Sequence, residues 1–180
     1  LKGEPIRRVM GIVNGTTNYV LSQMTERGIS YSDALSEAQS AGFAESDPSA
    51  DVDGQDAASK AAIIAMVAFG VRLGLSDVTY EGITDVSTDD IEFAKRFGHT
   101  IKLLAIAEND NGEVAVRVHP AMVPKHHPLA SVRDSFNAVF VEGDAVGDLM
   151  LYGRGAGGNQ GNTRRVVRTV PCSPAPWGNR

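Results

Sequence analysis

The chain is poor in the features that mark secreted and membrane proteins. Its 180 residues include one cysteine, Cys172, and one tryptophan, and they contain no run of the ~20 apolar residues that a membrane-spanning helix requires. A lone cysteine excludes a disulfide bond within the chain, and the first residues show no signal-peptide pattern. We therefore expect a cytoplasmic protein that does not span a membrane.

An excess of positive charge is also missing. The chain has 17 lysines and arginines against 22 aspartates and glutamates, which gives a net charge of −5, and no basic stretch is interleaved with aromatic residues. Because an acidic surface repels phosphate, we do not expect a nucleic-acid partner. The length and the hydrophobic content of 42% fit one domain of an intracellular enzyme.

What the chain does contain is a dense acidic segment at residues 42–60 (GFAESDPSADVDGQDAASK), in which five carboxylates precede Lys60. Carboxylates this close in sequence repel one another, so the pattern favours a site that holds a positive charge. Asp56 and Lys60 lie one turn apart on a predicted helix that runs to Gly70 and is otherwise almost wholly apolar. We expect this helix to be buried and Lys60 to be partly withdrawn from water, where a lysine can donate or accept a proton.

Two other interpretations apply to the same residues. Asp56 and Lys60 could form an exposed ion pair near a helix N-terminus, with Asp51 or Asp53 as the cap, and spacing alone does not separate this interpretation from a catalytic one. The stretch that ends at Gly54 also resembles part of a calcium-binding loop. Aligning Gly54 with the glycine of that loop places Lys60 where a bidentate glutamate is needed, so we expect no metal site.

Hydrophobic periodicity and turn residues predict an α+β fold with a mixed, largely antiparallel sheet and helices packed on one face. The turn sequences at 109–112 and 142–144 predict antiparallel neighbours. Gly28 and Gly42 are predicted to end two helices, and Ser32 to cap the second. The predicted strands are 7–13, 79–86, 101–108, 113–122, 138–142 and 148–152, and the predicted helices are 16–27, 33–41, 54–70 and 88–98.

The acidic segment belongs to a longer ordered pattern. Upstream, residues 9–21 read VMGIVNGTTNYVL, a predicted strand that ends in N-G-T-T-N before a helix. The acidic segment fits G-[YF]-A-E-x-D-P-x-x-D-x-x-G-x-D-x-x-x-K at each fixed position. Shorter matches follow at 119–120, 123–124, 127–130, 137–139, 143–144 and 151–157. Over about residues 4–158 these motifs resemble the catalytic region of bacterial homoserine dehydrogenase.

The resemblance implies an oxidoreductase that interconverts L-homoserine and L-aspartate 4-semialdehyde with NADP or NAD, in the biosynthesis of threonine, methionine and isoleucine. It implies that Lys60 is the proton donor or acceptor at the substrate oxygen, with Asp56 in a supporting or shared role. Substrate binding falls to Glu45, Asp51 and Asp56, since carboxylates suit the cationic α-amino group of homoserine.

The cofactor side of the implied site is assigned to small and polar residues. A missing Cβ allows close approach of the backbone to a ligand, and the amide and hydroxyl groups of a strand-to-helix turn could face the nicotinamide. For Asn14 a helix cap is an equally good interpretation. The residues implied in cofactor binding are Gly42, Asn14, Gly15, Thr16, Gly153 and Gly155.

A nucleotide-binding half is absent from the sequence. No strand–turn–helix glycine fingerprint opens the chain, and the literal G-x-G-x-x-G at residues 153–158 lacks both a following helix pattern and a suitably placed acid. We therefore expect residues 1–158 to be the catalytic and dimerisation region of a longer enzyme, without its Rossmann domain. Such a fragment is expected to be inactive alone, and its sheet to form a homodimer or higher oligomer.

Residues 159–180 depart from the family pattern, which continues G-A-G-x-x-P-T-A-S-A-V into a helix. This tail holds the only cysteine, the only tryptophan and three of the eight prolines. We hypothesise a shift of the reading frame near Gly158, and the other interpretation is a divergent disordered tail. No site is assigned there.

Two rival functions stay open at this point. The acidic loop could serve a non-enzymatic module that binds a small molecule or a metal, which a tight calcium response would favour. Alternatively, the chain could belong to a dehydrogenase of another amino acid or aldehyde, which would keep the lysine chemistry and change the roles of the carboxylates.

Overall fold

A computed structural model describes residues 3–155 and 168–171 of the chain. Its strands form one open sheet in the order β2-β4-β3-β1-β5-β6-β7. Neighbouring strands are antiparallel except β2 and β4, which are parallel. The predicted mixed, largely antiparallel sheet is therefore confirmed. The strands are β1 (Ile6–Ile12), β2 (Thr79–Tyr80), β3 (His99–Asp110), β4 (Glu113–Pro124), β5 (Phe136–Gly143), β6 (Gly147–Arg154) and β7 (Arg168–Pro171).

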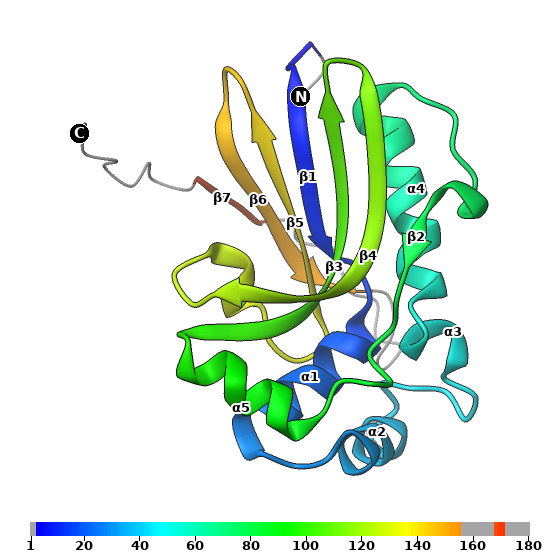
Figure 1. The fold of residues 1–180 in the computed structure, drawn as a ribbon, viewed down its shortest axis with the longest axis vertical. Coiled ribbons are helices and arrows are strands. Elements are labelled where there is room, and N and C mark those ends of the chain that lie inside the picture. The colour runs from blue at the N-terminus through cyan, green and yellow to red at the C-terminus, as the bar shows by residue number, and fades with distance from the viewer. Residues whose placement is uncertain (1–2, 156–167, 172–180) are drawn as a thin grey trace.

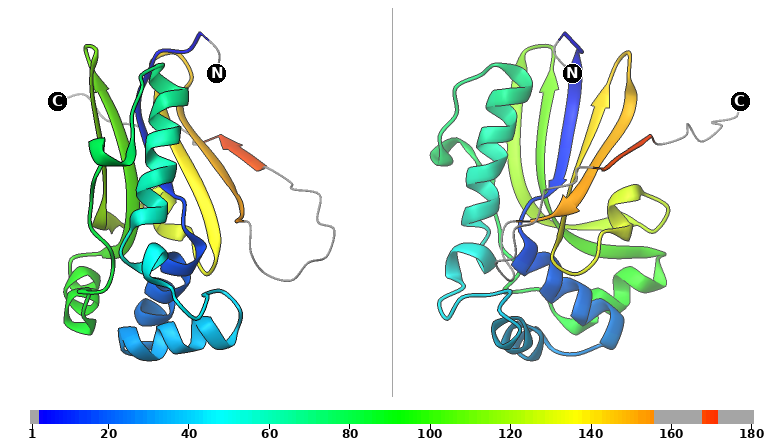
Figure 2. Two further views of the ribbon diagram at one scale, coloured as in Figure 1. Left: turned by 90° about the vertical axis from the view of Figure 1, so that its right-hand side faces the viewer. Right: turned by 180° about the vertical axis from the view of Figure 1, so that it is seen from behind.

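The helices lie against one face of this sheet. In Figures 1 and 2, α4 runs along the sheet while α1, α2 and α5 gather at one end of it. The larger apolar core lies between these helices and β3 and β4, which confirms the predicted one-sided packing. The helical elements are α1 (Gly15–Arg27), α2 (Tyr31–Ser40), α3 (Ser49–Val52), α4 (Gln55–Phe69), α5 (Thr88–Arg96) and the short 3₁₀ turns η1 (Leu75–Asp77) and η2 (Pro128–Ser131).

The opposite face of the sheet carries a second, smaller apolar cluster. Its buried members come from β1, β3, β4, β5 and β6 and from the segment around η2, where Leu129 and Val132 are fully buried. His127 stacks on Phe140 at 4.8 Å between ring centroids. Within the described residues, α1–α5 contribute no buried member to this cluster, so the segment around η2 is its main cover.

Local sequence signals place most of the element boundaries. Gly28 ends α1 in the left-handed conformation, with a φ of 67°, as predicted. The second helix begins two residues earlier than expected, because Ser30 rather than Ser32 accepts the hydrogen bond from the Asp33 backbone N–H. The hairpin at Asn111 joins β3 to β4 as its turn sequence predicts.

The strand predicted at 79–86 is wrong beyond Tyr80. After two residues paired with β4, the chain turns inward, and the N–H of Ile83 donates to the carbonyl of Val52 at 2.8 Å. Gly82 permits this close crossing of two backbones, so the apolar residues of the segment pack against α3 and α4 instead of extending the sheet.

The prediction that α4 is buried on nearly every face is also wrong. Its alanines form the face that packs on the sheet, because small side chains allow close approach. Ile63 and Val67 point away from the core and are 55% and 82% exposed. The outward stripe also includes Lys60, so the apolar sequence of α4 marks one packed face and one open face.

A buried lysine that carries no motif lies near the start of β3. Lys102 on β3 is 3% exposed, and its Nζ donates to Asn18 Oδ1 at 2.9 Å and to the carbonyl of Val132. Burial lowers the pKa of Lys102 to about 8, opposed in part by the charge of Glu26. The folded protein therefore releases this proton more readily than the unfolded chain does.

We expect the stability of the chain to increase as the pH rises from about 8 to 10.5. In that range the unfolded state keeps the Lys102 proton while the folded state has lost it, so the free energy of unfolding rises by up to about 3 kcal/mol. Urea unfolding of the parent and of Lys102→Met across this range measures the effect. Equal pH slopes for the two proteins would contradict it.

Candidate active site

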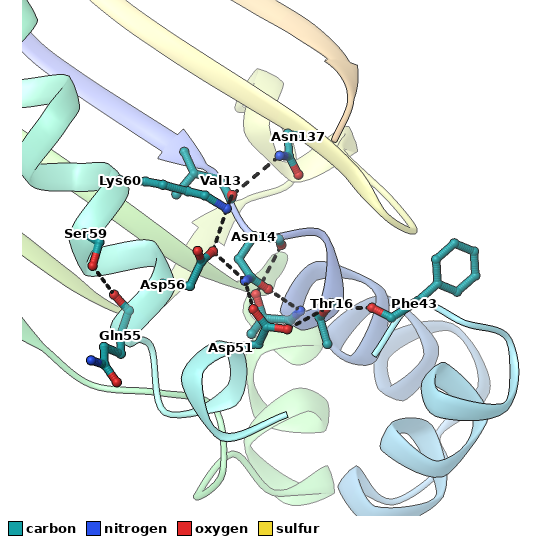
Figure 3. Close-up of polar contacts among 11 residues, drawn as sticks. Val13, Asn14, Thr16, Phe43, Asp51, Gln55, Asp56, Ser59, Lys60 and Asn137 are labelled. Carbon is teal, nitrogen blue, oxygen red and sulfur yellow. Dashed lines mark hydrogen bonds and ion pairs between the residues drawn. The ribbon is translucent and has the colours of Figure 1, made fainter. Parts of the chain in front are cut away.

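The acidic segment folds around a cleft at the junction of β1, α1, α3 and α4. The cleft has a volume of about 630 Å³. Figure 3 shows side chains from these elements pointing toward one another beside the end of β1. Residues that are distant in sequence therefore meet in one place because the strand-to-helix turn after β1 abuts the N-terminal ends of α3 and α4.

Asn14 is the hub of the polar contacts in this cleft. Its Oδ1 accepts the N–H of Thr17 at 2.9 Å, which caps α1 as one interpretation of the sequence expected. Its Nδ2 donates to Asp51 Oδ1 at 2.6 Å and to Asp56 Oδ2 at 2.9 Å. The cap and the site are thus the same buried side chain, and one asparagine holds two carboxylates in place.

Lys60 completes the chain of contacts from the other side. Its Nζ lies 2.5 Å from Asp56 Oδ2 and 3.1 Å from the carbonyl oxygen of Val13, the residue before Asn14. The side chain of Lys60 is 46% exposed, so its withdrawal from water is only partial. The physical reason is that α4 turns this face away from the sheet. An ammonium held by one carboxylate and one carbonyl retains a third N–H to offer to a ligand.

Asp51 is anchored to the start of α1 instead of capping α4. Its Oδ2 accepts from the hydroxyl of Thr16 at 3.0 Å, and that hydroxyl also lies 2.7 Å from the carbonyl oxygen of Phe43. Gly54, not Asp51 or Asp53, occupies the N-cap of α4 and has no side chain to offer. The ion-pair interpretation is therefore right about the contact between Asp56 and Lys60 and wrong about the cap.

Nearly all of the residues singled out in the sequence come together here. The exception is Gly153, which lies on β6 opposite Asn137 and is not part of the cleft wall. Glu45 lines the cleft with an exposed side chain, and Gly42 adopts a φ of 76° with open space beside its Cα. The predicted residues that line the cleft are Asn14, Gly15, Thr16, Gly42, Glu45, Asp51, Asp56, Lys60 and Gly155.

Two glycines in the cleft wall are places where a Cβ would not fit easily. A Cβ on Gly15 would lie 3.1 Å from the carbonyl oxygen of Ser135, and one on Gly155 would lie 3.0 Å from Asn137 Nδ2. Gly15 thus packs against the residue just before β5, and Gly155 packs against a residue within β5. The glycines are therefore explained by close packing of the site itself.

Sequence reasoning missed several members of the wall. Asn137, Ser135 and the carbonyl of Val13 line or define the cleft, but no role was assigned to them. The motif at 137–139 was part of the recognised pattern and contained the signal for Asn137. A backbone carbonyl such as that of Val13 has no sequence signal, since every residue carries one.

Within 3–155 and 168–171, no group of three or more histidine, cysteine, aspartate or glutamate side chains is arranged to hold a metal ion. Over the same part of the chain, no helix is both long and apolar enough to cross a membrane.

Comparison with known proteins assigns the chain that forms this cleft to a family. A sequence model of homoserine dehydrogenase matches residues 1–163. The chain belongs to the homoserine dehydrogenase family. Homoserine dehydrogenase of Corynebacterium glutamicum is 57% identical over 163 residues, which are 88% of this chain and 37% of that protein. The chain thus spans a little over a third of the relatives it matches.

Solved homoserine dehydrogenases share the fold as well as the sequence. The crystal structure of the S. aureus enzyme at pH 6.0 superposes with a TM-score of 0.84 at 45% identity, covering 87% of this chain and 40% of that one. A hyperthermophilic archaeal homoserine dehydrogenase in complex with NADPH gives a TM-score of 0.71 at 31% identity, covering 88% of this chain and 44% of that one. Family membership does not favour a non-enzymatic acidic-loop module.

Proposed function

We propose that this chain is the catalytic region of an NADP- or NAD-dependent homoserine dehydrogenase, which interconverts L-homoserine and L-aspartate 4-semialdehyde. The observation that carries the proposal is the convergence of Lys60, Asp56 and Asn14 in one cleft of a chain that belongs to this family. The family's aspartate-derived amino-acid biosynthesis supplies the metabolic setting.

Lys60 is the residue that moves the substrate proton. Oxidising an alcohol to an aldehyde by hydride transfer requires removal of the hydroxyl proton, and the reverse reaction requires its return. In aldehyde reduction the Lys60 ammonium gives its free N–H proton to the substrate oxygen, and in alcohol oxidation the neutral amine takes the hydroxyl proton. The contacts of Nζ with Asp56 and the Val13 carbonyl fix its position in the cleft. Asp56 supports the charged form of the lysine and, through Asn14, ties it to the start of α1.

The charge balance of the cleft suits the amino end of homoserine. Glu45, Asp51 and Asp56 line it against the single cation of Lys60, so a ligand that brings a positive charge is favoured. Asp51 already accepts from Asn14 and Thr16, whereas the carboxylate of Glu45 has no hydrogen-bond partner among the described residues. Glu45 is therefore the carboxylate most open to the α-ammonium group.

The residues on the remaining wall fit a nicotinamide ring. Gly15 and Gly155 let the backbone pack closely on Ser135 and Asn137, and the buried Oδ1 of Asn137 has no hydrogen-bond partner among the described residues. A planar ring that carries a carboxamide matches a narrow wall with an unused amide acceptor. When bound, the nicotinamide supplies the site that accepts or returns the hydride. NADP and NAD both carry this ring, so the residues of this wall do not distinguish one cofactor from the other.

We also propose that residues 1–158 act as one catalytic and dimerisation region. The support for dimerisation is the second face of the sheet, whose apolar cluster is covered mainly by the segment around η2 and by none of α1–α5 among the described residues. The proposed boundary, and most of the atypical tail at 159–180, lie outside the described residues. Within the tail, β7 pairs with β6, so its four residues continue the sheet. A cytoplasmic location and the reading-frame hypothesis stay predictions.

A chimera tests the proposed function directly. Residues 1–155 replace the matching segment of the C. glutamicum homoserine dehydrogenase, which supplies the rest of the enzyme. We expect homoserine-dependent formation of NADPH or NADH at a rate within about tenfold of the unmodified enzyme, since the walls of the cleft come from this chain. A folded chimera that binds the cofactor and shows no turnover would contradict the proposal.

Glu45→Gln is expected to raise the KM for homoserine by about tenfold in this chimera and to leave kcat within about threefold. The reason is that the substitution removes one charge-assisted hydrogen bond that substrate and transition state share. Steady-state kinetics measure both constants. Glu113→Gln, at the exposed start of β4, is the matched control and is expected to change neither. An unchanged KM for Glu45→Gln would remove this residue from the substrate site.

A further inference from the structure

The amide of Asn137 is poorly satisfied where it stands. Its Nδ2 lies 3.5 Å from the carbonyl oxygen of Val13, the limit of a hydrogen bond, and its Oδ1 is buried with no partner among the described residues. Because a carbonyl only accepts, the nitrogen is the atom that faces Val13. A buried amide oxygen without a donor is uncommon in folded proteins and costs free energy, so this group has an unused capacity to accept.

The backbone on either side of this amide is firmly held. Asn18 on α1 donates through Nδ2 to the carbonyls of Asp134 at 2.8 Å and Phe136 at 3.2 Å. Buried Lys102 donates to Asn18 Oδ1 and to the carbonyl of Val132. The segment that leads into β5 is thereby tied to α1, so the position of the Asn137 backbone is fixed while its amide is not.

The space around the amide permits it to turn. A Cβ on Gly155 would lie 3.0 Å from Asn137 Nδ2 and 3.4 Å from its Oδ1, so the glycine keeps open the volume through which the amide plane rotates. The torsion that turns an asparagine amide has a broad energy profile. Figure 3 shows the amide beside Val13 and Lys60, at the reacting end of the cleft. A half-turn would set Oδ1 against the Val13 carbonyl oxygen, so it is a partial turn that brings Oδ1 from its enclosed position toward a ligand held by Lys60.

We propose that Asn137 is a specificity residue for the cofactor, whose amide turns so that Oδ1 accepts a hydrogen bond from the carboxamide N–H of the nicotinamide ring. This inference rests on the proposed function. For hydride transfer, the ring carbon that exchanges the hydride would lie against the reacting carbon of the substrate. That ring carbon is bonded to the one that bears the carboxamide. Lys60 holds the oxygen on the reacting carbon of the substrate. The carboxamide therefore lies at the end of the cleft where Asn137 stands.

The substrate is a poorer partner for this oxygen. Its ammonium group is drawn to the carboxylates Glu45 and Asp51, its carboxylate has no proton to donate, and its hydroxyl is occupied by Lys60. A primary carboxamide has two N–H donors and an acceptor oxygen, so it can donate to Oδ1 of Asn137 and accept from its Nδ2. The chemistry at this wall thus matches the cofactor.

A two-by-two binding experiment in the chimera tests the assignment. Dissociation constants are measured by calorimetry for the natural oxidised cofactor and for its 3-acetylpyridine analogue, in which a methyl ketone replaces the carboxamide and removes the N–H donors. With Asn137 present, we expect the analogue to bind about fivefold more weakly. With Asn137→Ala, we expect the natural cofactor to bind about fivefold more weakly and the analogue to be unaffected, so that the preference disappears.

A second variant separates recognition from support of the wall. Asn137→Asp keeps an acceptor oxygen and loses the N–H donor, so it is expected to retain the preference for the carboxamide. Equal weakening of both cofactors by Asn137→Ala would show a role in packing alone and would overturn the inference. A preference that persists in Asn137→Ala would overturn it as well. An unmodified chimera that binds neither cofactor would instead refute the proposed function, and the inference with it.

Discussion

Replacing Lys60 by alanine is expected to lower kcat of the chimera by at least about 100-fold while leaving the affinity for the cofactor within about twofold. The loss follows from the contacts of its Nζ, since Asp56 and the Val13 carbonyl hold one ammonium at the reacting end of the cleft. No other lysine or arginine among the described residues lines this cleft, so no neighbour can take over the proton transfer.

The measurement combines steady-state turnover with cofactor binding for the parent and Lys60→Ala. Lys125→Ala is the matched control, because Lys125 is an exposed lysine in the turn after β4 and lies outside the cleft wall. We expect it to retain full activity. If Lys60→Ala stays as active as this control, Lys60 is a structural residue, and the acidic segment has to be interpreted as a binding site alone.

Gly82→Ala is expected to destabilise the chain by at least about 3 kcal/mol or to prevent folding. A Cβ at this position would lie 2.5 Å from the Asp53 Cα and closer still to the carbonyl oxygen of Val52. Both obstacles are backbone atoms, so no side-chain rotation relieves the clash. Separating the two segments would also break the 2.8 Å hydrogen bond from Ile83 to Val52. Helix α3 and its C-cap residue Asp53 would then lose this support, and Asp51 lies on that helix.

Urea unfolding of the parent and of Gly82→Ala gives the difference in the free energy of unfolding. Gly74→Ala serves as the control, because a Cβ there would meet its nearest atoms at an ordinary 3.7 Å. We expect that control to change the stability by less than about 1 kcal/mol. A Gly82→Ala protein as stable as Gly74→Ala would mean that the crossing of the two backbones is not tight in solution.

Gly28 and Gly82 show which parts of the fold the local sequence can predict. Gly28 is readable as a helix end, because a left-handed residue after a polar helix is a local feature. Gly82 looks like an ordinary interruption of an apolar run, and the run itself predicts a strand to residue 86. Only contact with Val52, thirty residues earlier in the chain, shows why the strand stops at Tyr80.

The site divides in the same way. The spacing of Asp56 and Lys60 on one helix predicts their ion pair, and the N-G-T-T-N motif predicts the cap formed by Asn14. Nothing local predicts that Asn14 also binds Asp51 and Asp56, because those contacts join segments 37 and 42 residues apart. Asn137 belongs to a recognised motif, yet only the placement of β5 beside Val13 leaves its oxygen without a partner among the described residues.

The sequence by itself determined the family, the α+β class, the hairpins and most helix ends of this protein. These follow from motifs, periodicity and turn chemistry, which depend on residues close along the chain. The tertiary structure alone decided that α4 has an open face with Lys60 on it, and that Lys102 is buried. Exposure depends on which surfaces pack together across long separations, and a lysine on a strand carries no local sign that a neighbouring loop will cover it.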